Sequence, residues 1–321
     1  MQLNKELKDS IAESFNPNKT LETAVLFLIF NRLNTTKKVF EAIRLAKPPR
    51  LYVAADGARM TKQGEAEKVK SVRDYVLKNI DWNCEVKTLL RDENLGCKHA
   101  VSSALNWFFQ NEEMGIILED DCLPNNSFFW YCENLLKLYK DDLRIWHIGG
   151  VNFQDNIIRG DGDYYFSKYN HIWGWASWAS RWKFYDVEIN NIKESSFINN
   201  TFSDKSIISY WYKKYKKVKA NKIDTWDYQW TFTIWKNKGI SILPKFDLVS
   251  NIGFGEDATH TTSSVNLTKE SYSLDVRKHP QKILVDIYAD DYTFNSIFRK
   301  GPLLIRILKK VKILLNDILK T

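Results

Sequence analysis

The sequence predicts an α/β fold, in which a mainly parallel, Rossmann-like sheet has helices on both faces and continues into a mixed, aromatic-rich C-terminal half. Three observations predict this fold. Short apolar runs alternate with stretches of helical periodicity through residues 21–143, polar residues follow each apolar run, and aromatic residues become frequent after about residue 144. An alternating βαβαβαβ order is typical of a parallel sheet.

The apolar runs justify the strands of the first half in turn. Residues 24–30 read AVLFLIF, a continuous apolar run that suits a strand buried on both faces. Residues 51–55 form a second run, which ends at the turn signal Asp56-Gly57. The predicted strands are 24–30, 51–55, 86–90 and 116–118, and the predicted helices are 35–46, 62–79 and 98–110.

The second half changes character but is not set apart by a linker. Strand-like pieces at 145–149, 164–166 and 240–243 are separated by aromatic-rich loops. No stretch rich in Pro, Gly and Ser precedes them, so this half is predicted to pack on the first as one unit. The chain contains 12 tryptophans, which serve a core or form flat faces for sugar rings and bases.

Composition excludes several classes of protein. Hydrophobic residues make up 44% of the chain, which argues against disorder. The four cysteines form no C-x-x-C pair, so no zinc site or disulfide framework is expected and a reducing compartment is the default. No apolar run approaches the ~20 residues of a membrane span, and residues 1–20 lack the apolar region of a secretory signal. The net charge of +8 favours an anionic partner, yet no nucleic-acid-binding module is recognisable.

Three consecutive acids, Glu119, Asp120 and Asp121, follow the predicted strand 116–118. Burying adjacent carboxylates is costly unless a cation compensates their charge. Oxygen ligands of this kind suit Mn²⁺ or Mg²⁺, particularly when substrate phosphates complete the coordination shell. The alternative is a solvated acidic loop, and the buried strand directly before the acids argues against it.

Other polar residues follow the neighbouring strands: Asn31 and Arg32, Asp56, and Arg91. In parallel sheets ligands bind at the carboxyl ends of the strands, so these residues are predicted to form one site. The chain has no G-x-x-x-x-G-K-[ST] and no G-x-G-x-x-G motif. What remains is an enzyme that holds a nucleoside diphosphate through a metal and breaks the bond beyond it, which requires a base to activate the attacking hydroxyl.

Taken together, these motifs resemble the GT-A glycosyltransferases, most closely the inverting N-acetylglucosaminyltransferase I type in a bacterial form. The resemblance runs over about residues 24–262. Its motifs are Asn31-Arg32, Asp56, Glu119-Asp120-Asp121, Ile172-Trp173-Gly174-Trp175, Trp226-Asp227, and Gly253-Phe254-Gly255 followed by His260.

The resemblance implies a role for each site residue. Asp121 would bind the metal, Asp120 the ribose, and Glu119 the hydroxyls of the donor sugar. Asp56 would accept a hydrogen bond from the uracil imide, and Asp227 would be the catalytic base. Further donor contacts would come from Asn31, Arg32 and Arg91, acceptor contacts from Trp173 and Trp175, and a closing loop from His260.

One departure from the family and several simpler readings stand beside these roles. The second acid of the family's W-D-D-W motif is missing here, where Tyr228 follows Asp227, so Asp224 is an alternative base. Asp227 is also suited to cap a helix, Asp56-Gly57 to form an ordinary turn, and the tryptophans to fill the core.

The expected organisation has three parts. Residues 1–20 form an N-terminal helical extension, and residues 21–280 form the glycosyltransferase domain, with a nucleotide-sugar-binding half (21–143) and an acceptor-binding half (144–280). Residues 281–321 contain a basic amphipathic helix. Its apolar positions share one face while Arg306, Lys309 and Lys310 lie on the other, which suits an anionic membrane or docking on the chain's own domain.

The predicted function is therefore metal-dependent transfer of a sugar, with N-acetylglucosamine as the leading candidate, from a UDP-sugar to a hydroxyl of a glycan or lipid-linked acceptor. The predicted stereochemistry is inverting, and the predicted location is cytoplasmic, peripheral on the inner face of the membrane. The alternatives are a sugar nucleotidyltransferase, or a non-catalytic protein that binds carbohydrate or membrane.

Overall fold

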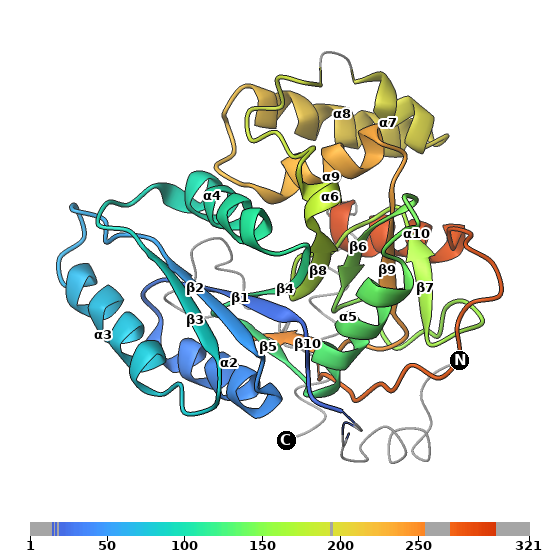
Figure 1. The fold of residues 1–321 in the computed structure, drawn as a ribbon. Helices are drawn as coiled ribbons and strands as arrows, with labels where there is room; N and C mark the ends of the chain where they lie inside the picture. The colour runs from blue at the N-terminus through green and yellow to red at the C-terminus, as the bar shows by residue number, and fades with distance from the viewer. Residues whose placement is uncertain (1–14, 16, 18, 193–194, 254–269, 300–321) are drawn as a thin grey trace, which may run out of the picture.

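The computed structural model, which describes residues 15, 17, 19–192, 195–253 and 270–299, is built on a central eight-stranded sheet (Figure 1). Its strands lie in the order β3-β2-β1-β4-β8-β6-β9-β7. Their bounds are β1 (Ala24–Ile29), β2 (Arg50–Ala55), β3 (Glu85–Leu90), β4 (Met114–Glu119), β6 (Ile145–Gly149), β7 (Tyr164–Ser167), β8 (Trp175–Trp178) and β9 (Ile240–Pro244).

The directions of the strands confirm the predicted α/β fold with a mostly parallel sheet. β1 pairs in parallel with β2 and with β4, and β2 pairs in parallel with β3. β8 runs antiparallel between β4 and β6, and therefore joins the two halves of the chain into one sheet. A small second sheet pairs β5 (Cys122–Pro124) with β10 (Val249–Asn251). This pairing brings the segment after the acidic triplet next to residues near position 250.

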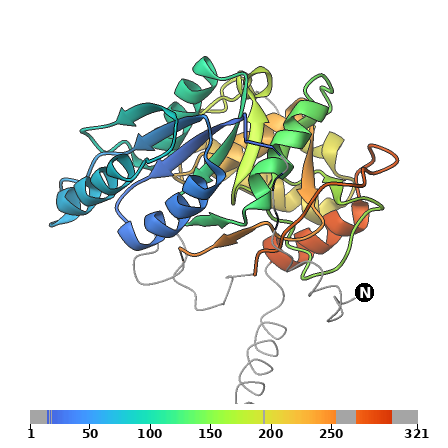
Figure 2. The same ribbon diagram turned by 60° about the horizontal axis from the view of Figure 1, so that its bottom comes forward.

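Helices cover both faces of the sheet (Figures 1 and 2). One hydrophobic cluster joins the sheet to α2, α3 and α5, and the other joins it to α4, α7, α8 and α9. The main helices are α2 (Leu33–Ala46), α3 (Glu65–Lys78), α4 (Gly96–Asn111), α5 (Ser127–Leu138), α7 (Ser196–Thr201), α8 (Lys205–Lys219), α9 (Asp227–Lys236) and α10 (Ile287–Thr293); a single turn, α6 (Ala179–Trp182), follows β8, and a π-helical turn, η1 (Phe294–Phe298), follows α10.

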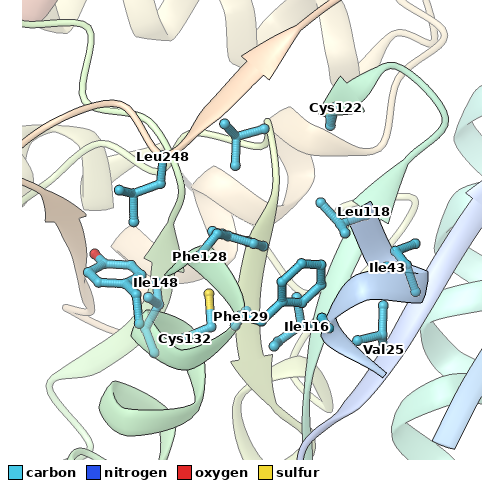
Figure 3. Packing of buried hydrophobic residues seen from close by; sticks show 14 of the residues in the cluster. Val25, Ile43, Ile116, Leu118, Cys122, Phe128, Phe129, Cys132, Ile148 and Leu248 are labelled. Atoms are coloured by element: carbon cyan, nitrogen blue, oxygen red, sulfur yellow. The ribbon is translucent and has the colours of Figure 1, made fainter. Parts of the chain in front are cut away.

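The core lies between β1, β4 and the helices packed on them. All six residues of β1 are buried, as its apolar sequence predicts. Figure 3 shows how Val25 and Ile116 of the sheet lie near Ile43 of α2 and Phe129 of α5. This packing holds the carboxyl ends of β1 and β4 rigidly side by side, which is where the candidate site lies.

Several predictions lie outside the described part of the chain. His260 and the segment 301–321 are among these residues, as is most of the predicted extension 1–20. The division into two functional halves stays a prediction. Within the part of the chain that the structure describes, no helix is both long and apolar enough to cross a bilayer.

Candidate active site

A cavity of about 720 Å³ lies at the carboxyl ends of β1, β2 and β4. Residues 223–228, which lead into α9, also line it. Most of the residues predicted from the sequence meet here, although they come from distant parts of the chain. The predicted residues that line it are Arg32, Asp56, Arg91, Glu119, Asp120, Asp121, Trp173 and Asp227, together with the alternative base Asp224.

The acidic triplet is held by an arginine. Arg32, which precedes α2, forms ion pairs with Asp120 and with Asp121, the latter at 2.9 Å between Nη2 and Oδ2. Asp120 is almost fully buried, with a side-chain exposure of 4%, and also accepts a bond from the N–H of Phe30 at 3.2 Å. Asp121 is more open, at 15%. Arg32 thus compensates two of the three carboxylates directly.

Burial and mutual repulsion set the protonation of the triplet. Desolvation, only partly offset by the charge of Arg32, raises the pKa of Asp120 to about 6. Desolvation, with added repulsion from Asp121 and Asp120, also raises the pKa of Glu119 well above its usual range. No described residue donates a hydrogen bond to Glu119, so its carboxylate is available to a ligand in the cavity.

Gly253, just after β10, lies against the ion pair between Arg32 and Asp121. A Cβ atom at this position would lie 2.7 Å from Nη1 of Arg32 and 2.7 Å from Cβ of Asp121. Only a residue without a side chain fits this close approach.

Gly253→Ala is therefore expected to push Arg32 and Asp121 apart and to cost about 1–3 kcal/mol of unfolding free energy, the usual cost of overpacking. Urea denaturation measures this cost, and loss of nucleotide binding reports the change at the site. Gly239→Ala is the control, because a Cβ there would lie 2.5 Å from Cδ1 of Trp146, so this variant is overpacked as well. Gly239 does not line the cavity, and its variant is expected to lose stability and to keep nucleotide binding. A Gly253→Ala variant that binds nucleotide like the wild type would contradict the predicted crowding.

Asp56 is a structural cap as well as a cavity residue. Its carboxylate accepts bonds from the backbone N–H of Leu95 (2.9 Å to Oδ1) and of Gly96 (3.1 Å to Oδ2), and from Nδ2 of Asn94 at 2.9 Å. Oδ1 accepts only the Leu95 bond among the described residues and retains a lone pair for a ligand. The simple turn reading of Asp56-Gly57 is incomplete, because this carboxylate joins β2 to the start of α4.

Asp224 contributes a second carboxylate to the start of α4. Its Oδ1 accepts a bond from the backbone N–H of Lys98 at 3.2 Å. Asp56 and Asp224 together take up free N–H groups of the first turn of α4. The N-terminus of α4 is therefore occupied by carboxylates and is not an open anion site.

The strand ends that carry Asp56 and Arg91 are tied together by Arg73 of α3. The guanidinium of Arg73 donates to the carbonyl oxygens of Asp56, at 3.0 Å, and of Arg91. Arg91 itself donates to Oγ of Ser103 at 2.7 Å, and no described carboxylate pairs with it. Arg91 is thus the lining arginine that is available to an anionic ligand.

Asn31 lies outside the predicted site, and one arginine of the site was missed. Asn31 is not among the described lining residues, and its Nδ2 donates to Oε1 of Glu65 at 2.9 Å. Glu65 also pairs with Arg59, which does line the cavity. The position of Arg59, two residues after the Asp56-Gly57 turn, was the only signal for it in the sequence.

The two predicted tryptophans separate. Trp173 lines the cavity, whereas Trp175 is completely buried and its ring stacks on Trp226 with centroids 5.7 Å apart. Trp175 is in β8, and all four residues of this strand are buried. It belongs to the core, and only Trp173 is placed to contact a ligand.

Asp227 is the first residue of α9 and lines the cavity together with the triplet. Its Oδ1 accepts bonds from the hydroxyl of Thr225 and from the backbone N–H of Tyr228, the latter at 2.8 Å. Its Oδ2 accepts no bond from any residue in the described ranges. One oxygen therefore fixes the side chain while the other is available for proton transfer, so the cap and base readings are compatible.

The charge of the cavity bears on which ligands fit. Of its described lining residues, six are acidic and three are basic. Two of the three arginines are already paired, Arg32 with the triplet and Arg59 with Glu65. A phosphate-bearing ligand would need a cation to enter this site.

The described carboxylates of the cavity do not form a complete metal cage. No group of three His, Cys, Asp or Glu side chains with metal-binding geometry occurs in the described ranges. Mg²⁺ and Mn²⁺ do not need such a cage when one or two carboxylates and substrate phosphates complete the shell. For Asp121 to act in that mode, a metal that arrives with the phosphates has to replace Arg32 as the partner of Oδ2, since Oδ1 accepts a bond from Sγ of Cys122.

No protein-family model and no curated protein matches the chain. A mannosyltransferase from Pyrobaculum calidifontis, in complex with GDP-mannose and Mn²⁺, aligns over 57% of this chain and 53% of its own, with a TM-score of 0.37 and 12% identity. The glycosyltransferase GlyE of Streptococcus pneumoniae aligns over 69% and 45%, with a TM-score of 0.34 and 10% identity. An apo UDP-glucose pyrophosphorylase aligns over 71% and 93%, with a TM-score of 0.35 and 9% identity.

The chain spans about half the length of the first two of these proteins. Identities and TM-scores this low carry no argument about what the chain binds. Its function has to be argued from the residues of the cavity.

Proposed function

We propose that this chain is a metal-dependent GT-A glycosyltransferase that transfers a sugar from a UDP-sugar to a hydroxyl group, with inversion at the anomeric carbon. The observation that carries the proposal is that Asp227 lines the same cavity as Glu119, Asp120 and Asp121. A glycosyltransferase needs both in one cavity: carboxylates that hold the metal of the leaving diphosphate, and a base that deprotonates the attacking hydroxyl. N-acetylglucosamine is the proposed sugar, on the resemblance of the motifs alone.

The proposed chemistry uses this chain's residues as follows. Oδ2 of Asp227 takes the proton of the acceptor hydroxyl, and the hydroxyl oxygen forms a bond to the anomeric carbon of the donor. The bond between that carbon and the diphosphate breaks, and its electron pair leaves with UDP. Asp121 would hold Mn²⁺ or Mg²⁺, which when bound supplies Lewis-acid stabilisation of the leaving diphosphate. Glu119 would accept hydrogen bonds from hydroxyls of the donor sugar, Asp120 would bind the ribose, and Asp56 would accept a hydrogen bond from the imide N–H of uracil.

The sugar nucleotidyltransferase alternative fits the charge of the cavity less well. Such an enzyme binds a nucleoside triphosphate, which carries more negative charge than a diphosphate. The described lining residues are net acidic, and only Arg91 among the lining arginines has no acidic partner. This balance of charge favours a nucleoside diphosphate with a bound metal over a nucleoside triphosphate.

The acceptor and the location are also proposals. A glycan or lipid-linked acceptor suits the aromatic side of the cavity at Trp173. Binding of segment 301–321 to an anionic membrane would place a cytoplasmic enzyme at the inner face of the membrane, near such an acceptor. This segment lies outside the described residues, and its role rests on its sequence pattern.

Thermal unfolding in the presence of nucleotides tests the proposal. UDP with Mn²⁺ is expected to raise the melting temperature more than GDP or CMP, because Asp56 is proposed to accept the imide N–H of uracil. A ligand at 100 times its Kd stabilises the folded state by ~2.7 kcal/mol. Asp121→Asn is expected to remove the Mn²⁺-dependent part of this shift. Asp74→Asn, which changes an exposed ion pair on α3, is the matched control and should leave the shift intact.

The outcomes separate the candidate functions. Release of UDP from UDP-sugars in the presence of glycans would support the glycosyltransferase. A larger shift with UTP than with UDP, and pyrophosphate release from UTP and a sugar 1-phosphate, would favour the nucleotidyltransferase. If no nucleotide raises the melting temperature, both enzyme functions are contradicted and a non-catalytic binding protein remains.

A further inference from the structure

Arg32 pairs with the same carboxylate that the proposed function assigns to the metal. Its Nη2 lies 2.9 Å from Oδ2 of Asp121 and also pairs with Oδ1 of Asp120. A guanidinium group stays charged in proteins, so this pairing persists across the pH range in which the carboxylates are ionised. The two aspartates are therefore already compensated by a cation that belongs to the chain.

The carboxylate of Asp121 has little room for a second cation. Its Oδ1 accepts a bond from Sγ of Cys122 at 3.4 Å. A Cβ atom on Gly253 would overlap Oδ2, so the backbone of Gly253 lies close to this oxygen. A divalent metal has to approach a carboxylate oxygen to about 2 Å, and at Oδ2 it would be repelled by the neighbouring guanidinium. A metal and Arg32 therefore compete for Oδ2.

Asp121 is the fixed partner of this ion pair, and Arg32 is the movable one. The backbone carbonyl of Asp121 accepts a bond from the N–H of Ile252 at 2.8 Å, next to the pairing of β5 with β10. The side chain of Arg32 is 20% exposed and lines the cavity. In the described ranges its guanidinium pairs with Asp120 and Asp121 alone. Rotation of its side chain can therefore carry the charge into the cavity without a change in the backbone.

A diphosphate would offer the guanidinium a partner equivalent to the one that it gives up. Guanidinium groups form the same planar, charge-assisted hydrogen bonds with phosphate oxygens as with carboxylates. A metal that binds without a nucleotide offers no such partner and leaves Arg32 unpaired beside another cation. Binding of the metal alone is therefore disfavoured, and binding of the metal together with a diphosphate is not.

We propose that Arg32 competes with the metal for Asp121, so that the nucleotide-free chain binds Mn²⁺ weakly, and that its guanidinium pairs with the diphosphate when metal and nucleotide bind together. Only ion pairs are exchanged, and no covalent bond changes. The exchange couples the two ligands, so each tightens the binding of the other by the same factor. The pairing with a diphosphate rests on the proposed function, whereas the competition with a divalent cation can be measured without a nucleotide.

Mn²⁺ binding to the full chain in the absence of nucleotide tests the competition. The EPR signal of free aqueous Mn²⁺ measures the affinity of the wild type and of each variant. Arg32→Gln is expected to bind Mn²⁺ about tenfold or more tightly than the wild type, because the carboxylates lose the competing charge. Arg44→Gln is the matched control: Arg44 also pairs with two carboxylates, of Glu41 and Asp81, but lies outside the cavity, and its variant should bind Mn²⁺ like the wild type.

Two double variants locate the effect and guard against unfolding. Adding Asp121→Asn to Arg32→Gln is expected to abolish the gained Mn²⁺ binding. Adding Asp120→Asn instead removes the buried charge that Arg32 leaves unpaired, and this variant should bind Mn²⁺ more tightly than Asp120→Asn alone. Mn²⁺ is also expected to raise the melting temperature of Arg32→Gln more than that of the wild type, because a ligand of the folded state stabilises it.

The move of Arg32 to the diphosphate is tested by repeating the titration with UDP, against the Mn²⁺–UDP complex that forms without protein. UDP is expected to tighten Mn²⁺ binding by a smaller factor in Arg32→Gln than in the wild type. The variant has no competitor to displace and no guanidinium to pair with the diphosphate. An equal factor in both proteins would overturn this part of the inference.

The competition is overturned if the wild type and Arg32→Gln bind Mn²⁺ equally without nucleotide, or if the gained binding survives Asp121→Asn. A persisting shift with UDP and Mn²⁺ would then leave the proposed function standing. A UDP shift of equal size with and without Mn²⁺ would make Arg32 the permanent cation of the site, and would contradict both the inference and the proposed metal dependence. Tighter Mn²⁺ binding in Arg32→Gln without any nucleotide shift supports the competition and contradicts the proposed function.

Discussion

An Asp227→Asn variant is expected to bind UDP and Mn²⁺ as the wild type does and to transfer sugar about 10²–10⁴ times more slowly, the range for loss of a general base. Asparagine retains an oxygen that accepts the bonds from Thr225 and from the N–H of Tyr228. The start of α9 is therefore preserved, and only proton transfer at Oδ2 is lost. The measurement is the rate of UDP release at saturating donor and acceptor.

Asp224→Asn is the matched comparison, because Asp224 is the alternative base and lines the same cavity. Its oxygen would still accept the N–H of Lys98, which keeps the cap of α4. A small effect on turnover is expected. A large loss of turnover in Asp224→Asn, together with a near-normal rate in Asp227→Asn, would identify Asp224 and not Asp227 as the base.

The second large effect is expected at Arg32. Arg32→Leu leaves the buried carboxylate of Asp120 without its main compensating charge, and breaking a buried ion pair from one side costs about 3–5 kcal/mol. Such a loss is a large fraction of the 5–15 kcal/mol by which most proteins are stable. Urea denaturation of the wild type and the variant measures it.

Two controls show whether the effect comes from the buried charge. Arg44→Leu breaks an exposed pair with Asp81 and is expected to change stability little. Adding Asp120→Asn to Arg32→Leu removes the unpaired charge and is expected to restore part of the lost stability. An Arg32→Leu variant as stable as Arg44→Leu would mean that the triplet does not depend on the guanidinium.

Local patterns in the sequence were sufficient for β1 to β4 and for α2 to α4, but β5 and α5, which also lie in the first half, were not predicted. The run 24–30 appears as β1 (Ala24–Ile29), and the run 116–118 lies within β4 (Met114–Glu119). A parallel strand buried on both faces needs a continuous apolar run, and the pattern is readable without tertiary information. In the second half β8 and β10 were not predicted, because strands of four and three residues are too short for an alternating pattern to stand out.

The candidate site was partly predictable for a related reason. Polar residues directly after buried strands have to meet at one edge of a parallel sheet, so Asp56 and the triplet followed from order along the chain. Which atoms remain free does not follow from that order. Asp56 is largely occupied by the start of α4, Asn31 turns to Glu65, and Oδ2 of Asp227 is open.

The sequence by itself therefore determined the α/β class, the positions of the early strands and the acids at their ends, because each depends on neighbours within a few residues. The tertiary structure alone decided the pairing of Arg32 with the triplet, the burial of Trp175, and the place of Asp227 in the same cavity as the triplet. These features depend on which side chains from distant segments come within a few ångströms of each other. Such contacts arise from packing and charge compensation in three dimensions, and no periodicity along the chain encodes them.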